Sequence, residues 1–124
     1  LPLQLGFDRF AGFLGGAQSH FATKRWEGNC PLTPANDTYS AELYGELAHA
    51  TLLEYDQTAV DAKPLFFYLP WQNVHAPYQA PLQWSGDVLR GMLSSTDEAL
   101  GNMVNTLKAK GMWDNTVIFY SADK

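Results

Sequence analysis

Residues 64–81 read PLFFYLPWQNVHAPYQAP, a short apolar run followed at once by a proline-rich polar loop. The run Leu65 to Leu69 shows no alternation of apolar and polar side chains, which is typical of a strand covered on both faces. Pro70, Pro77 and Pro81 each remove a backbone donor and restrict the residue before them, so a loop follows the run. We therefore predict a central parallel strand with a stiffened loop at its carboxyl end.

Two amphipathic helices and a second strand surround this run in the sequence. The first helix is predicted to begin at Ser40, a candidate N-cap, with apolar side chains at three- and four-residue spacing as far as Tyr55. The second has its apolar face between Met92 and Leu107, and Gly111 stands where a C-cap glycine belongs. Residues 116–120, TVIFY, are β-branched and aromatic and predict a second buried strand. The order helix, strand, loop, helix, strand is typical of βαβ units, so the predicted fold class is α/β with a parallel sheet.

The composition is that of a packed globular chain with no attraction for nucleic acid. Its 124 residues are 46% hydrophobic, and Lys+Arg 8 against Asp+Glu 13 give a formal net charge of -5. This balance offers no basic surface to a phosphate backbone and argues against a nucleic-acid partner. The longest apolar run, 64–71, is far shorter than the roughly 18 residues that a membrane helix needs, so no membrane span is predicted.

We interpret the whole chain, residues 1–124, as one partial domain. It begins without Met and ends at Lys124, directly after the apolar run 116–120, so both ends look cut. The residues before Pro34 are dense in glycine and aromatic residues without a regular period, which indicates irregular loop. An isolated segment of this kind is expected to leave strand edges and an apolar face uncovered, and to be poorly soluble.

Polar side chains follow both predicted strands, where ligands bind in open α/β sheets. His75 lies in the loop after the first strand, and Asp123 comes directly after the second. If the strands are neighbours, the two side chains converge and place a general acid or anion-binding group beside an oxygen donor for a hard cation. The ordinary interpretations stay open, because loop histidines are often just exposed or hydrogen-bonded, and an Asp at a strand end usually caps the next turn.

The remaining chemistry-bearing residues give weaker signals. Cys30 is the single cysteine, so it cannot form an internal disulfide, and no basic residue nearer than Arg25 supports a reactive thiolate. Asn36 begins an N-x-[ST] tripeptide, a glycosylation acceptor if the chain enters a secretory compartment. We assign no role to His20, in the irregular segment, or to His49, on the polar side of the first helix.

Six blocks of the sequence, in this order and spacing, resemble the type I sulfatases, most closely the arylsulfatase B-like branch. The blocks are 6–13 (GFDRFAGF), 63–69 (KPLFFYL), 73–81 (NVHAPYQAP), 96–101 (TDEALG), 111–118 (GMWDNTVI) and 121–123 (SAD). The match covers nearly the whole chain apart from a divergent stretch at about 18–37. The resemblance implies that residues 1–124 are part of a sulfatase catalytic domain with the alkaline-phosphatase-like α/β/α sandwich.

The resemblance also implies hydrolysis of sulfate esters on a glycan or aryl substrate. Family members use a formylglycine made from Cys or Ser, whose hydrate attacks sulfur, with Ca²⁺ neutralising the sulfate oxygens. His75 matches the family histidine that contacts the sulfate and is a candidate to assist departure of the leaving group. Asp123 matches the first residue of an Asp-Asn pair that ligates Ca²⁺. Animal members are mostly secretory, lysosomal or extracellular, and the same compartments are expected here.

The sequence departs from the family pattern at the nucleophile and at the metal. The motif C/S-x-P-x-R is absent, because Cys30 is followed directly by Pro31, so the formylglycine is expected outside residues 1–124. Lys124 stands where the family has a metal-binding Asn, and an ammonium group repels Ca²⁺. Two alternatives stay open: a phosphodiesterase or phosphonate hydrolase of the same superfamily, or a non-catalytic sulfatase-like protein that binds sulfated sugars through Trp71, Tyr78 and Trp84.

Overall fold

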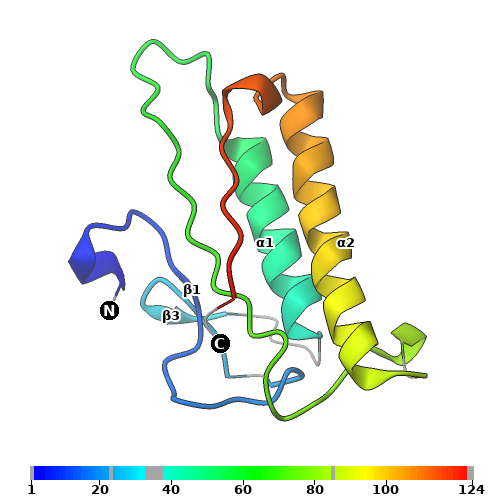
Figure 1. Cartoon of the computed structure of the whole chain (residues 1–124). Helices are drawn as coiled ribbons and strands as arrows, with labels where there is room; N and C mark the ends of the chain where they lie inside the picture. The colour runs from blue at the N-terminus through cyan, green and yellow to red at the C-terminus, as the bar shows by residue number, and fades with distance from the viewer. Residues whose placement is uncertain (1, 23, 33–37, 85, 123–124) are drawn as a thin grey trace.

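The computed structural model describes residues 2–22, 24–32, 38–84 and 86–122. Its longest elements are two helices, α1 (Ser40–Glu54) and α2 (Val88–Ala109), which lie side by side and run in the same direction (Figure 1). The shorter elements, in chain order, are η1 (Pro2–Leu5), β1 (Ala11–Gly12), β2 (Trp26–Glu27), β3 (Cys30–Pro31), η2 (Leu82–Trp84) and η3 (Trp113–Asn115). None of the described helices is long and apolar enough to cross a membrane.

The two helices pack closely because small residues face each other at their contact. A Cβ placed on Gly45 of α1 would lie only 2.7 Å from the Cβ of Ala99 on α2. Leu52, Leu107 and Met112 form a buried cluster near the carboxyl ends of the two helices. The predicted periodicity of both helices is therefore confirmed, and it produces a common buried seam.

The start of α1 differs from the prediction. Ser40 is the first helical residue rather than the N-cap, and the N-cap residue, Tyr39, makes no side-chain capping bond. The Ser40 amide donates to the main-chain oxygen of His20 at 2.8 Å, and its hydroxyl lies 3.0 Å from His20 Nδ1. A distant segment thus satisfies one of the free backbone donors of the first turn.

Both ends of α2 have regular caps. The Asp87 side chain accepts a hydrogen bond from the Arg90 amide at 3.1 Å, which satisfies one free donor of the first turn. At the other end Gly111 has a φ of 65°, and the Met112 amide donates to Leu107 O at 2.8 Å. This is a Schellman motif, in which glycine is favoured because φ is positive, so the predicted role of Gly111 is confirmed.

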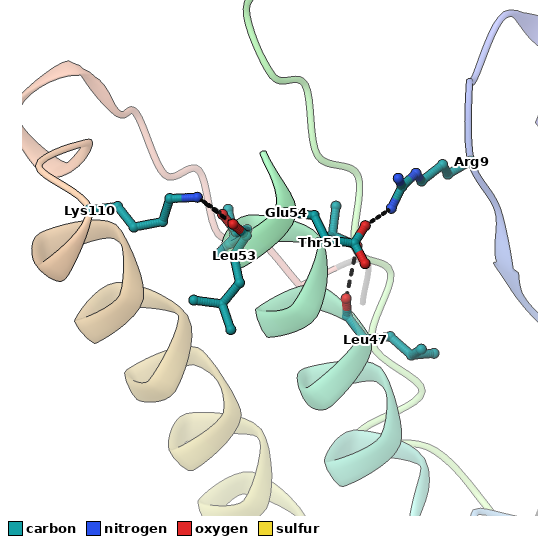
Figure 2. A network of polar contacts seen from close by, with 7 residues as sticks. Arg9, Leu47, Thr51, Leu53, Glu54 and Lys110 are labelled. Atoms are coloured by element: carbon teal, nitrogen blue, oxygen red, sulfur yellow. Dashed lines mark hydrogen bonds and ion pairs between the residues drawn. The ribbon is translucent and has the colours of Figure 1, made fainter. Parts of the chain in front are cut away.

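Lys110 connects the end of α2 to the end of α1 (Figure 2). Its Nζ donates to the main-chain oxygens of Leu52, Leu53 and Tyr55 at 2.6, 2.7 and 2.6 Å. A cation at the last carbonyls of a helix satisfies free acceptors and complements the helix dipole. Arg9 forms a second link to this end of α1 through an exposed ion pair with Glu54 at 2.6 Å.

The two predicted buried strands are not strands in this structure. Residues 65–69 and 116–120 are extended but take part in no ladder, and Phe66 and Phe119 are 76% and 90% exposed. The one sheet among the described residues is antiparallel, in the order β1-β2-β3. A ladder requires a second strand about 4.8 Å away, and the described residues supply none to either segment. The α/β class is thus seen in part, with helices and extended segments in the predicted order but without the parallel sheet.

Candidate functional site

The loop that carries His75 is tied to α2 through the side chain of Asn73. Asn73 Nδ2 donates to Met92 O at 2.6 Å and to Thr96 Oγ1 at 2.9 Å, and it lies 3.2 Å from Ser95 Oγ. Ser95 and Thr96 are buried, so these bonds lie in the interior, where an unpaired amide is costly. The loop is therefore fixed to the first half of α2 two residues before the histidine.

Tyr39 ties the same loop to the start of α1. Its hydroxyl is 3.1 Å from Asn73 Oδ1 and 2.8 Å from Gln79 O, so its single proton lies within hydrogen-bond distance of an acceptor on each side of His75. Tyr39 is buried, and this burial raises the pKa of its hydroxyl. The hydroxyl thus keeps its proton at neutral pH and remains a donor.

His20 lies at the centre of this arrangement and is fully buried. Its Nε2 is 3.0 Å from His75 O, and its Nδ1 is 3.0 Å from Ser40 Oγ. Because a carbonyl oxygen only accepts, Nε2 carries the proton, and in the neutral ring Nδ1 accepts from the Ser40 hydroxyl. Burial lowers the pKa of His20 and outweighs the hydrogen bond to the His75 carbonyl, which raises it, so the neutral form is favoured.

The segment before α1 also holds the far side of the loop. Gln79 Oε1 accepts from the Ser19 hydroxyl at 2.9 Å and from the His20 amide at 3.0 Å. On the near side Gln72 Nε2 donates to Gln18 O at 2.6 Å. Residues 18–20 therefore bind the loop both before and after His75.

The imidazole of His75 is exposed, although the backbone beneath it is anchored. Its Nδ1 lies 2.7 Å from Ala76 O, and since that oxygen only accepts, Nδ1 carries a proton. Nε2 has no hydrogen-bond partner among the described residues. The ring can therefore offer Nε2 to a ligand while its other nitrogen is held by the loop itself.

The second predicted site residue, Asp123, lies outside the described residues, as do Lys124 and Asn36. The predicted convergence of His75 and Asp123 therefore stays a prediction. Within the described part of the chain, no group of three His, Cys, Asp or Glu side chains could hold a metal ion. Since Ca²⁺ takes about six to eight oxygen ligands, the described residues do not form a calcium site by themselves.

The other residues singled out in the sequence do not gather at one place. Cys30 is an exposed free thiol. Tyr78 and Trp84 are exposed, and no ring contact in the described part joins either of them to Trp71. His49 Nδ1 is 2.7 Å from Thr106 Oγ1, so this histidine links α1 to α2. No ring contact in the described part of the chain therefore supports an aromatic surface made of the three predicted residues.

The sequence singles out His75 as a candidate, but it does not indicate the residues that hydrogen-bond to its loop. His20 lies in a segment without periodicity, and Tyr39 directly precedes the predicted helix start at Ser40, so no sequence pattern singles out either residue. One signal was available in Gln72, Asn73 and Gln79, amide side chains in a loop pinned between prolines. Amides in a stiff loop next to apolar segments need fixed partners, but nothing in the pattern says where these lie.

Comparison with known proteins identifies the class. The sulfatase family model matches residues 2–124, so the chain belongs to the sulfatase family, and the predicted resemblance is confirmed. The chain is 30% identical over 145 residues to arylsulfatase J of Mus musculus, covering 99% of this chain and 24% of that protein. It is 25% identical over 133 residues to the uncharacterized sulfatase YdeN of Escherichia coli (strain K12), covering 98% of this chain and 23% of that protein. The chain thus spans about a quarter of the length of these curated relatives.

Proposed function

We propose that the protein containing this chain hydrolyses sulfate esters and that His75 contacts the substrate sulfate and assists departure of the leaving group. The observation that carries the proposal is the exposed His75 imidazole, with Nε2 open to a ligand, on a loop anchored on both sides. Membership of the sulfatase family over residues 2–124 supports the choice of ester. The proposed substrates are sulfated glycans or aryl sulfates, and the proposed compartment is secretory, lysosomal or extracellular.

The proposed role of His75 is proton donation to the leaving oxygen. Hydrolysis of a sulfate ester consumes one water, and the bond between sulfur and the ester oxygen breaks with its electron pair on that oxygen. In the protonated ring Nδ1 and Nε2 each carry one proton, and Nε2 gives its proton to the ester oxygen as the bond breaks. Nδ1 keeps its bond to Ala76 O, so the direction in which the ring presents Nε2 does not change.

The nucleophile and the metal are assigned beyond the described residues. We propose that the formylglycine lies outside residues 1–124, since this sequence holds no C/S-x-P-x-R motif. Asp123 is proposed as one oxygen ligand of Ca²⁺, which would neutralise sulfate charge when bound. The described residues do not complete such a site, and the step proposed for His75 does not depend on it.

A pair of substrates with different leaving groups tests the role of His75. The protein is expressed with the sequence that flanks residues 1–124 in its transcript and assayed with and without Ca²⁺ on 4-nitrophenyl sulfate and phenyl sulfate. General acid catalysis contributes about 10²- to 10⁴-fold, so His75→Ala should lower kcat by about 10²-fold on phenyl sulfate. The loss should be smaller on 4-nitrophenyl sulfate, because 4-nitrophenolate leaves without needing a proton.

His49→Ala is the matched control, because it removes an imidazole that binds Thr106 between the helices rather than one on the loop. It should keep kcat on both substrates. Equal losses on both substrates in His75→Ala would exclude proton donation by His75. A folded wild-type protein that turns over neither substrate would instead favour the non-catalytic sulfate binder, the candidate suggested by Lys124 in place of the metal-binding Asn.

A further inference from the structure

We propose that His20 is a positioning residue for His75, fixing the backbone of the loop at the point from which the His75 imidazole projects. The hydrogen bond from His20 Nε2 to His75 O, 3.0 Å long, joins a fully buried side chain to the residue whose own ring is exposed. The inference rests on the proposed function of His75. It concerns a buried histidine that takes no part in the chemistry itself.

The bond from His20 occupies a gap between the other anchors of the loop. Asn73 and Gln79 are held by α2, by Tyr39 and by the segment at Ser19. Between them, within the described part of the chain, His20 alone supplies a hydrogen bond that joins residues 74–78 to another segment. All five of these residues are exposed, so burial does not hold them in place. Without the bond from His20 this stretch would be fixed only at its two ends.

His20 is itself held firmly enough to transmit position. Its ring stacks on Tyr39 with centroids 5.3 Å apart and an interplanar angle of 14°. Its main-chain oxygen accepts from the Ser40 amide and from the Arg25 guanidinium, each at 2.8 Å. Ser40 Oγ fixes the second ring nitrogen, so the proton on Nε2 has one direction in which to point. The side chain of His20 thus connects the backbone of His75 to the first turn of α1.

Two amide variants separate positioning from ordinary structural support. In glutamine the side-chain amide lies near the position of histidine Nε2, so His20→Gln keeps a donor for His75 O. In asparagine it lies near Nδ1, so His20→Asn keeps a polar group facing Ser40 and loses that donor. Both variants replace a buried imidazole by a smaller polar amide, and both therefore disturb packing in a similar way.

The experiment compares kcat and KM of both variants in the protein expressed with its flanking sequence. Misplacement of a catalytic group by about 1 Å costs on the order of 10²-fold, so His20→Asn should lower kcat by about 10-fold or more and change KM by less than about 3-fold. His20→Gln should stay within about 3-fold of wild-type kcat. His49→Ala, which removes the part-buried bond to Thr106, controls for loss of stability and should keep kcat.

Limited proteolysis supplies a readout that does not need turnover. Chymotrypsin cleavage after Tyr78, the exposed aromatic residue of this stretch, should become faster in His20→Asn and should stay at the wild-type rate in His20→Gln and His49→Ala. Equal behaviour of the Asn and Gln variants in both assays overturns the positioning role. If the wild-type protein has no sulfatase activity, the proposed function fails, and the cleavage rates alone decide whether His20 fixes this stretch.

Discussion

Replacing Gly45 by alanine should destabilise the helix pair, although this change stabilises most helices. Alanine gains about 0.8–1 kcal/mol over glycine inside a helix. At Gly45, however, the new Cβ would lie 2.7 Å from the Cβ of Ala99 and 3.5 Å from its Cα. The helices would have to separate by about 0.7 Å to bring the closer contact to 3.4 Å, the start of the ordinary range. Overpacking of this kind typically costs 1–3 kcal/mol, so we expect a net loss of about 1 kcal/mol.

Gly101→Ala is the matched control, because Gly101 is an exposed helical glycine of α2 with no heavy atom within 4 Å of a built Cβ. There only the propensity gain remains, and α2 should be stabilised by about 0.5–1 kcal/mol. Native-state hydrogen exchange of the α1 and α2 amides measures both effects locally. A change of 1 kcal/mol alters an exchange rate about 5-fold, so exchange should be faster in Gly45→Ala and slower in Gly101→Ala.

A double variant tests the cause of the loss. Adding Ala99→Gly to Gly45→Ala removes the clashing Cβ of Ala99. Ala99→Gly should therefore cost less stability in the Gly45→Ala variant than in the wild-type protein. The difference between the two costs should be about 2 kcal/mol, the overpacking part alone. If Gly45→Ala slows exchange as Gly101→Ala does, the close approach of α1 and α2 at Gly45 and Ala99 is refuted.

Three further predictions concern the groups that hold the loop and the helix ends. Burial lowers the pKa of His20 in the folded chain, so the unfolded chain, in which histidine titrates near pH 6.5, binds the proton more readily. The stability of the wild-type protein should therefore be complete above about pH 6.5 and fall as the pH drops below it. The thermal midpoint of His20→Gln should fall less over the same pH range. Asn73→Ala removes the bonds from the loop to Met92 O, Thr96 Oγ1 and the Tyr39 hydroxyl and should cost about 1–3 kcal/mol, and an unchanged thermal midpoint would contradict this. Lys110→Met breaks three bonds to main-chain carbonyls at the end of α1 and should lower the free energy of urea unfolding by about 1.5–3 kcal/mol. Arg9→Met breaks only the exposed ion pair with Glu54, so it should lower this free energy by less than about 1 kcal/mol, and the difference should disappear in high salt.

The helices could be predicted from the sequence because their information is local. Apolar spacing and the glycine at 111 are read within one or two turns, and both are confirmed. The expected N-cap at Ser40 was wrong because His20, far away in the chain, takes both its amide and its hydroxyl. Strand pairing is non-local in the same way. Residues 65–69 have the composition of a buried strand, but a ladder also needs a neighbour that the described residues do not supply.

The same difference between local and non-local interactions applies to the candidate site. Prolines on both sides of His75 predicted a stiff loop, since each restricts its own φ and the residue before it. In the structure the loop is also held by hydrogen bonds to His20, Tyr39 and α2, whose partners lie 19 to 55 positions away along the chain. No periodic pattern encodes bonds of that kind, so the sequence indicated the histidine and left its supports unassigned.

The loop and the helix pair form one mechanical unit. Asn73 is bonded to the first half of α2, while His75 is bonded through His20 to the first residue of α1. These anchors lie two residues apart on a short loop, and hydrogen bonds tolerate little change in length. A separation of the helices near Gly45 moves the helices that carry these two anchors, so we expect at least one anchoring hydrogen bond to lengthen in Gly45→Ala. The close contact of Gly45 with Ala99 should therefore affect the position of the His75 loop as well as the stability of the helix pair.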